Sequence, residues 1–169
     1  MSVRPLRYLG DPILRTPADP VSRFDAALAN LVEDLLDTVQ EPGRAGLAAN
    51  QIGSGLAAFA YNVEGQLGYL INPTIVELDG EQEGLEGCLS VPGVTALRRR
   101  AARTVAAGVD LERGKVVLDG TGELARCFQH EIDHLHGRLY IDKLDASERR
   151  RVLRQLNAAQ LAGGSAGIG

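Results

Sequence analysis

The chain has 169 residues, of which 44% are hydrophobic and 24% charged, and this mixture is typical of one globular domain rather than of a disordered or fibrous protein. The formal net charge of −4 provides no positive field for nucleic acid, so we expect no nucleic-acid recognition. The sequence contains neither a signal-like N-terminus nor an apolar stretch long enough to cross a bilayer, and we expect a cytoplasmic protein without a membrane anchor.

The N-terminal part of the chain combines a proline-rich arm with a helix. Four prolines fall within residues 1–21, and because proline fixes φ and removes a backbone donor, we expect an extended or turning arm that wraps the core. From Ser22 onward apolar residues recur at intervals of three and four, which predicts an amphipathic helix that ends at Pro42 and Gly43. The apolar residues of this helix are Phe24, Leu28, Leu31, Leu35 and Val39.

The middle of the chain is expected to form short strands separated by glycines. The glycine-rich residues 43–55 are followed by β-like runs at residues 56–61, 69–72, 74–78, 104–111 and 115–118. Residues 81–93 combine glycine and proline with acidic side chains, so composition predicts a loop with Cys88 in its middle. We interpret the basic run at residues 98–100 as a solvated edge, because it lacks interleaved aromatic residues.

Two further helices are expected in the last third of the chain. One helical pattern begins near Glu123 and ends at Gly137, and a final helix begins at Ser147, whose side chain can cap it. The apolar stripe of the final helix is formed by Val152, Leu153, Leu156 and Ala159. Residues 163–169 are too rich in glycine to pack, so we expect a single domain at residues 1–162 and a flexible tail after it.

The strongest chemical signal lies at residues 129–134, where Gln-His-Glu-Ile-Asp-His contains an H-E-x-x-H pattern. Residues four apart project from nearly the same side of a helix, so His130 and His134 can bind one metal ion. Glu131 can then take a proton from water and return it to a leaving amine. Only three histidines exist in the chain and two have this spacing, so we favour a metal site over two surface histidines.

Catalytic metal sites of this kind usually have three protein ligands, so a third must come from elsewhere. Tyr140 stands where one class of metalloprotease has its third histidine. Cys127 lies about 7.5 Å along the helix axis from the midpoint of the two histidines, at 1.5 Å per residue, which favours a buried apolar role for it. Cys88 can come from another part of the fold and is the ligand we favour. A thiolate with two imidazoles suits Zn²⁺ or Fe²⁺, and the residue types do not decide between them.

A hydrolase also needs hydrogen-bond donors for the oxyanion that forms on the attacked carbonyl. Residues 46–51, Gly-Leu-Ala-Ala-Asn-Gln, offer a glycine that permits close backbone approach and an amide donor at Gln51. Taken alone, this segment is better explained as a tight turn.

Three motifs taken together resemble the signature motifs of the peptide deformylases, in the same order and with similar spacing. They are residues 46–51, residues 86–90 with the sequence Glu-Gly-Cys-Leu-Ser, and residues 129–134. The resemblance covers nearly the whole chain and includes Gly-Asp-Pro-Ile-Leu at residues 10–14. It implies an α+β fold in which small antiparallel sheets pack around a central motif-bearing helix, with an N-terminal and a C-terminal helix.

The resemblance also implies an activity. A deformylase removes the formyl group from the N-terminal formyl-methionine of nascent peptides, a step of protein biosynthesis that releases formate. One divalent ion per chain is implied, Fe²⁺ in the cell, which Zn²⁺, Ni²⁺ or Co²⁺ can replace. The implied partners are N-formylmethionyl peptides and the ribosome near the nascent-chain exit, and we expect a monomer.

The resemblance assigns roles to residues by matching position. The metal ligands would be Cys88, His130 and His134. Glu131 would be the acid and base, while Gln51 and the backbone N–H of Leu89 would stabilise the oxyanion. Gly46 would contact the substrate backbone, and Cys127 would line the pocket for the methionine side chain.

Four more residues are assigned around these. Glu86 and Arg100 would pair behind the site, and Asp133 would orient a ligand. His136 points away from the ligand face of the helix, so we expect it to be solvated.

The first motif departs from the family pattern, which normally begins Gly-x-Gly, because this chain has Arg44, Ala45 and Gly46. Glycine adopts positive φ readily and arginine does not, so the path of the loop is expected to differ, with Gly43 able to supply that freedom one residue earlier. Ala45 is smaller than the aliphatic residue expected there, which predicts a wider substrate cleft.

Three other hypotheses remain open from the residues. The H-E-x-x-H pattern fits a metallopeptidase that acts on internal bonds, although its usual downstream ligand is missing. Cys88 with a histidine fits a cysteine hydrolase, which would be insensitive to chelators. A metal-stabilised peptide-binding homologue without turnover is the alternative that is not an enzyme, and the presence of Glu131 and Gln51 argues against it, since neither is needed to hold a metal.

Overall fold

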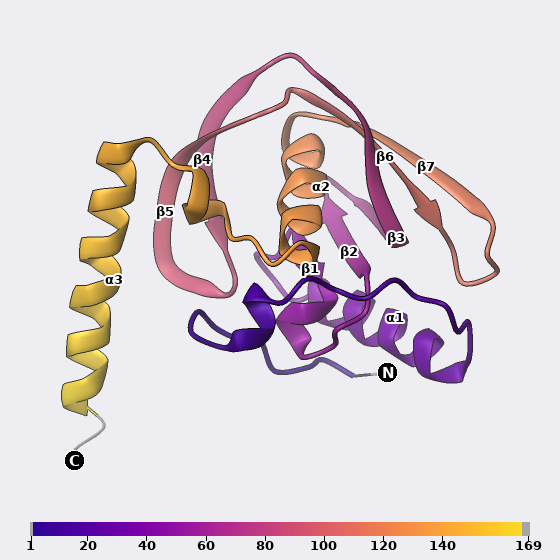
Figure 1. Cartoon of the computed structure of the whole chain (residues 1–169), viewed down its shortest axis with the longest axis horizontal. Helices are drawn as coiled ribbons and strands as arrows, with labels where there is room; N and C mark the ends of the chain where they lie inside the picture. Colours follow the sequence, from indigo (N-terminus) through magenta and orange to yellow (C-terminus); the bar gives the residue numbers. More distant parts are fainter. Residues whose placement is uncertain (1, 167–169) are drawn as a thin grey trace.

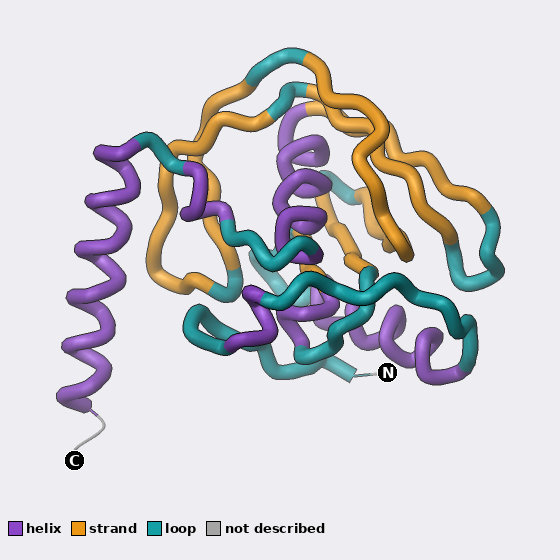
Figure 2. The backbone as a smooth tube through the Cα atoms, viewed as in Figure 1, coloured by secondary structure: helices purple, strands orange, loops and turns teal. Residues whose placement is uncertain are grey.

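The structure is a computed structural model that describes residues 2–166, and it has the expected α+β architecture (Figure 1). The helix α2 (Gly122–Leu135) lies at the centre, between a five-stranded sheet and a two-stranded sheet (Figure 2). The larger sheet has the strand order β1-β2-β3-β6-β7, the smaller one pairs β4 with β5, and all pairings between these strands are antiparallel. The predicted fold class is therefore confirmed.

The bounds of the elements follow the chain. The larger sheet contains β1 (Gly46–Ala48), β2 (Ala58–Val63), β3 (Gln66–Asp79), β6 (Arg103–Val109) and β7 (Lys115–Thr121). The smaller sheet contains β4 (Gln82–Cys88) and β5 (Val91–Arg100). The other helices are α1 (Ala26–Val39), α3 (Ala146–Ala166) and the short 3₁₀ helices η1 (Pro12–Arg15), η2 (Ala49–Ile52) and η3 (Tyr140–Lys143).

Helix α1 forms where the apolar period predicted a helix, but it begins at Ala26 rather than near Ser22. The carboxylate of Asp25 accepts a hydrogen bond from the backbone N–H of Leu28 at 3.1 Å and so fixes the N-terminus of the helix. The buried face of the helix contains Leu28, Val32, Leu35 and Val39. Each of these side chains contributes about 1.5–3 kcal/mol by leaving water, which holds α1 against β1 and β2.

The two strands expected at residues 69–72 and 74–78 are one continuous strand, β3, with an irregularity between them. Asn72 at this point has a positive φ of 51°, and its side-chain amide bonds the backbone N–H and carbonyl of Val21 at 2.7 and 3.0 Å. The irregularity thus ties the N-terminal arm to the sheet. The glycine-rich residues 43–55 also contain regular structure that composition did not predict, namely β1 and η2.

The loop predicted at residues 81–93 is wrong, because these residues belong to the hairpin of β4 and β5, whose turn is Leu89 and Ser90. Pro92 and Gly93 lie beside the register shift of the hairpin and have no cross-strand partners there. A strand accepts proline and glycine at such an unpaired position. The predicted solvated edge is also wrong, because Arg98 and Arg100 are buried and only Arg99 between them is exposed. Alternation along β5 turns every second side chain inward.

Helix α3 stands beside β5 at the edge of the molecule and extends beyond the strands (Figure 1). It begins at Ala146, so Ser147 lies inside the helix and is not its cap. Val152 is buried against β5, where the backbone N–H of Leu97 donates to the Glu148 carboxylate at 3.0 Å. The helix includes residues 163–166, which we expected in a flexible tail, and residues 167–169 lie outside the described part.

Among residues 2–166, no helix is both long and apolar enough to cross a membrane.

Candidate active site

Helix α2 carries two rows of side chains, each with a spacing of four residues, and all of them except His134 line one cavity. The first row contains Arg126, His130 and His134, and the second contains Glu123, Cys127 and Glu131. The helix ends at Leu135, and Gly137 follows with a φ of 74°, the left-handed conformation that commonly terminates a helix. The helix predicted between Glu123 and Gly137 is therefore confirmed, and its ladder fixes the spacing of both rows.

Three side chains meet at the end of the first row. The Nε2 atoms of His130 and His134 are 3.2 Å apart, and the Sγ of Cys88 is 3.2 Å from the Nε2 of His134. All three ligand atoms lie within 4.8 Å of one another. Two nitrogens bound tetrahedrally at the usual distance of about 2.0–2.1 Å are about 3.3 Å apart, so this arrangement fits one divalent ion.

Cys88 reaches the histidines because the β4–β5 hairpin approaches α2. The register of the hairpin shifts between Gly87 and Cys88, and this shift precedes a two-residue turn. Ser90 in the turn is fully buried, and its Oγ accepts a hydrogen bond from the Nε2 of Gln51 at 3.0 Å. A bulge at the strand end therefore aims the thiol at the two imidazoles.

Glu86 holds the imidazole of His130 from behind. Its Oε2 lies 2.7 Å from the Nδ1 of His130, so the Nε2 faces the point shared with Cys88. Arg100 donates to both carboxylate oxygens at 2.9 and 2.6 Å, which confirms the expected pair, and Arg126 donates to Oε1 at 2.8 Å. Burial raises the pKa of Glu86, but the hydrogen bonds and charges of Arg100 and His130 outweigh burial and hold the pKa well below its usual range.

Asp133 does not contact an imidazole, contrary to the expected orienting role. Its Oδ2 accepts a hydrogen bond from Arg100 at 2.7 Å, so it acts on the pair of Arg100 and Glu86. His136 is exposed, as expected.

Glu131 is 3% exposed, and its Oε2 has no hydrogen-bond partner among the described residues. Burial raises the pKa of this carboxyl to about 7, and the negative charge of Glu86 acts in the same direction. A buried carboxyl with an acidity near neutral is suited to taking and giving a proton. An unpaired buried oxygen near three atoms that could hold a metal ion also fits a site that holds a reacting water.

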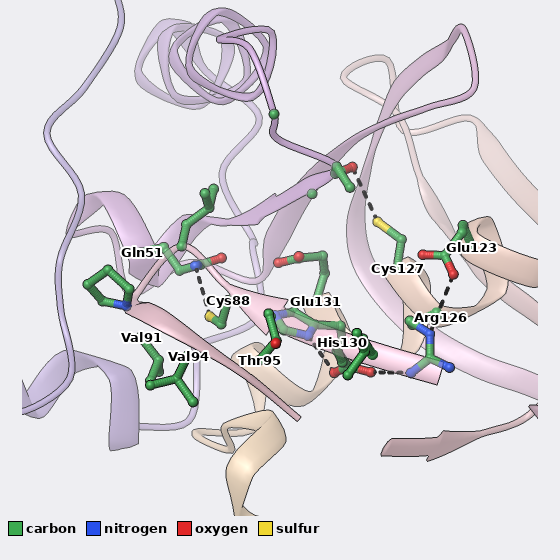
Figure 3. Close-up of a pocket in the computed structure, with 18 of the residues that line it drawn as sticks. Gln51, Cys88, Val91, Val94, Thr95, Glu123, Arg126, Cys127, His130 and Glu131 are labelled. Atoms are coloured by element: carbon green, nitrogen blue, oxygen red, sulfur yellow. Dashed lines mark hydrogen bonds and ion pairs between the residues drawn. The ribbon is translucent and has the colours of Figure 1, made fainter. Parts of the chain in front are cut away.

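Gln51 lies beside Cys88 (Figure 3), and hydrogen bonds fix its orientation. Its Oε1 accepts the backbone N–H of Ala48 at 2.9 Å, which directs its Nε2 toward Ser90 and toward Cys88 Sγ, 3.8 Å away. Leu89 follows Cys88 in the hairpin turn and lines the same cavity. Gln51 and Leu89 thus border the same cavity as Cys88.

The comparisons with known proteins agree on one family. Residues 3–150 match the family described as Polypeptide deformylase. The chain belongs to this family.

Similar proteins cover almost all of the chain. A peptide deformylase of Acidothermus cellulolyticus is 48% identical over 163 residues, which are 96% of this chain and 91% of that protein. The crystal structure of a peptide deformylase from Legionella pneumophila has a TM-score of 0.88 and 37% identity, and covers 96% of this chain and 98% of that one. The peptide deformylase from Thermus thermophilus has a TM-score of 0.86 and 40% identity, with 92% and 94% covered.

Membership in the deformylase family establishes the chain as a metal-dependent hydrolase of protein biosynthesis. It does not favour the metallopeptidase, the cysteine hydrolase or the inactive peptide-binding homologue. Sequence reasoning missed three residues around the deformylase site, namely Asn50, Ser90 and Arg126. Asn50 donates to the backbone carbonyl of His134 at 2.6 Å. The only signal that could have found them was position, because Asn50 precedes Gln51, Ser90 lies two residues after Cys88, and Arg126 lies four residues before His130.

The deformylase cavity has a volume of about 580 Å³ and extends along α2 from Cys88 and His130 toward Glu123. Gly46 is required at its wall, because a Cβ there would lie 2.5 Å from the Oε1 of Glu131 and 2.7 Å from the Sγ of Cys127. Cys127 is buried and donates to the carbonyl of Ala45 at 3.4 Å. Burial raises the pKa of this thiol well above its usual value, so the Cys127 side chain is uncharged where it lines the cavity.

Arg44, which departs from the deformylase motif, serves the preceding helix. Its Nη1 donates to the carbonyl of Thr38 in the last turn of α1 at 2.9 Å, while Gly43 has a φ of 82°. The expectation that Gly43 supplies the positive φ is confirmed. A cation at a helix C-terminus complements the partial negative charge of the last carbonyls.

Replacement of Arg44 by alanine is expected to lower the free energy of unfolding by about 0.3–1 kcal/mol, because one helix-terminal hydrogen bond and a favourable charge are lost. The value of kcat/KM is expected to stay within about twofold of the parent, since the guanidinium is directed toward α1. Urea unfolding and formate release measure the two quantities. A loss of kcat/KM above tenfold with unchanged stability would show that Arg44 acts on the cleft instead.

Replacement of Glu86 by glutamine is expected to lower the free energy of unfolding by about 3–5 kcal/mol, because Arg100 and Arg126 lose the buried carboxylate that both contact. The matched control is Glu83→Gln on the same strand. Glu83 pairs with Arg99 at 3.1 Å, with side chains 50% and 64% exposed, and its replacement is expected to cost less than about 1 kcal/mol. Equal losses in urea unfolding would contradict the stabilising role of the buried cluster.

Proposed function

We propose that the chain removes the formyl group from the N-terminal formyl-methionine of nascent peptides and releases formate, and that the residues described above carry this reaction. The observation that carries the proposal is the convergence of two imidazole nitrogens and one thiol beside the unpaired carboxylate oxygen of Glu131, counted over the described residues. Family membership supports the same activity. The catalytic domain would comprise residues 1–162.

The proposed metal ligands are Cys88, His130 and His134. A thiolate with two imidazoles suits several divalent ions, and we propose Fe²⁺ in the cell, with Zn²⁺, Ni²⁺ or Co²⁺ able to substitute. A bound ion supplies Lewis acidity, which lowers the pKa of water and polarises a carbonyl. The contact of His130 with Glu86 supports this assignment, because a carboxylate behind a ligating histidine fixes its tautomer and orientation.

The proposed catalytic step depends on proton transfer and on charge stabilisation by the protein. Glu131 takes a proton from water as general base and then delivers it to the leaving amine as general acid, which its near-neutral pKa supports. The Nε2 of Gln51 and the backbone N–H of Leu89 donate to the formyl oxygen as negative charge develops on it. The fixed amide of Gln51 supports this role, since a donor already in place needs no reorganisation during the reaction.

The proposed substrate lies along the cavity wall. The backbone at Gly46 contacts the peptide backbone, and the methionine side chain enters the pocket that Cys127 lines. We propose a monomer that acts in the cytoplasm on N-formylmethionyl peptides near the nascent-chain exit of the ribosome. Co-sedimentation with ribosomes tests the contact with the ribosome. A protein that stays in the supernatant while the ribosomes sediment would contradict it.

The test of the proposed function is formate release from a formyl-methionyl tripeptide by anaerobically purified protein whose metal content is counted. We expect formate release with about one ion per chain, loss of activity on chelation, and recovery when the ion returns. A protein that holds one ion per chain but releases no formate would contradict the proposed reaction. Activity that persists after complete removal of the ion would favour chemistry at the Cys88 thiol instead.

A further inference from the structure

One buried cation in the substrate cavity has a donor that the reaction described above does not use. Arg126 is 4% exposed, and it lines the cavity beside Cys127 and His130. Its Nη1 donates to Glu86 at 2.8 Å and to the carbonyl of Arg98 at 3.0 Å. Its Nε–H is buried without a hydrogen-bond partner among the described residues. A buried charged donor without an acceptor costs free energy unless a ligand supplies the acceptor.

The nearest carboxylate does not satisfy this donor. The Oε1 of Glu123 lies 3.8 Å from the Nε of Arg126, which is too long for a hydrogen bond, and the Glu123 side chain is 66% exposed. Figure 3 shows Arg126 with Glu123 on one side of its side chain and the carboxylate beside His130 on the other. The Nε is covered in this structure, so an acceptor that enters the cavity reaches the Nε–H when the exposed side chain of Glu123 moves aside.

The position of Arg126 along α2 indicates which part of a substrate it meets. Arg126 lies four residues before His130, so about 6 Å of helix axis separate it from this candidate metal ligand at 1.5 Å per residue. With the formyl group at the metal site, a side chain that runs along the cavity beside Cys127 has its end near Arg126 after about one helical turn. An extended methionine side chain is of this length.

We propose that Arg126 determines specificity in the pocket for the first side chain, where its Nε–H binds a hydrogen-bond acceptor at the end of that side chain. The substrate class would then include N-formyl peptides that begin with methionine sulfoxide as well as those that begin with methionine. The thioether sulfur is a weak acceptor and the sulfoxide oxygen a strong one, and a hydrogen bond from a charged donor is about twice as strong as a neutral one. The inference rests on the proposed deformylase activity.

The first experiment compares three N-formyl tripeptides that differ only in the first residue, which is norleucine, methionine or methionine sulfoxide. A wholly apolar pocket disfavours the sulfoxide by roughly 10- to 100-fold, because the polar oxygen is buried without a partner. We expect kcat/KM for the sulfoxide peptide to equal or exceed that for the norleucine peptide in the parent protein. A sulfoxide peptide hydrolysed more than tenfold less efficiently than the other two would overturn this inference and leave the deformylase activity standing. Hydrolysis of none of the three would overturn both.

The second experiment assigns the effect to Arg126. In Arg126→Leu, the ratio of kcat/KM for the sulfoxide peptide to that for the norleucine peptide is expected to fall at least tenfold. Both peptides are assayed with the same preparation. A smaller fraction of folded protein therefore lowers both values of kcat/KM equally and leaves their ratio unchanged. Arg126→Lys serves where the leucine variant does not fold, because its ammonium can pair with Glu86 but lacks the Nε–H. The matched control is Arg99→Leu at an exposed position of β5, where the ratio is expected to stay unchanged. A parallel fall of both peptides in the Arg126 variants would show a structural role and overturn the proposal.

Discussion

Formate release by a Glu131→Gln variant is expected to fall by roughly 100- to 10,000-fold while about one ion per chain is retained. Glutamine has nearly the shape of glutamate but takes up no proton, so the variant removes the proton carrier. The three residues proposed to bind the ion are Cys88, His130 and His134, and this cluster does not include Glu131. Initial rates with a saturating formyl-methionyl peptide, together with elemental analysis of the same preparation, measure both parts of the prediction.

The control for this variant is Glu83→Gln, which makes the same chemical change on the exposed side of β4. Its rate is expected to stay within about twofold of the parent, because Glu83 lies outside the cavity. If Glu131→Gln instead lost the ion, the lower rate would report on metal binding and the assignment of Glu131 as proton carrier would fail. A Glu131→Gln rate within tenfold of the parent would also contradict the assignment.

The helices were predictable from the sequence because their signal is local. Apolar residues spaced by three and four define α1 and α2, and the left-handed Gly137 marks the end of α2. The spacing within α2 also made His130 and His134 predictable as neighbours, since it depends only on the helical period.

The smaller sheet was not predictable from composition. Residues 81–93 contain the glycine and proline that usually indicate a loop, but cross-strand pairing and burial decide their conformation. The alternation of buried and exposed side chains along β5 was hidden by its arginines, because Arg98 and Arg100 occupy inward positions where apolar residues are usual. These arginines are buried only because Glu86, Asp133 and backbone carbonyls receive their hydrogen bonds.

The candidate site was predictable in part. Motif spacing and the resemblance identified the residues proposed for metal binding, proton transfer and oxyanion stabilisation, but not the residues that act through tertiary contacts. Ser90 orients Gln51 across a distance of 39 positions in the chain, and Arg126 joins Glu86 across 40. No local pattern encodes such contacts, so they become visible only when the hairpin and α2 are brought together.

Replacement of Cys88 by alanine is expected to weaken binding of the ion by more than roughly 100-fold and to abolish formate release, because only two imidazoles remain at the site. Cys88 lies on β4 and not on α2, so the result tests whether the hairpin supplies the third ligand. A metallopeptidase with its third ligand elsewhere would keep the ion. Titration of the metal-free protein with Zn²⁺, beside formate release after reconstitution with Fe²⁺, measures affinity and activity separately.

The matched control is Cys127→Ala, which removes the other thiol in the cavity. Its Sγ donates to the Ala45 carbonyl at 3.4 Å and is absent from the cluster of metal-ligating atoms, so the affinity for Zn²⁺ is expected to change by less than about threefold. Loss of the ion in Cys127→Ala and retention in Cys88→Ala would reverse the assignment of the two thiols. The two variants differ only in which thiol of the cavity is removed, because Cys88 and Cys127 both line it. Among the described contacts, only Cys88 has its sulfur 3.2 Å from an imidazole nitrogen.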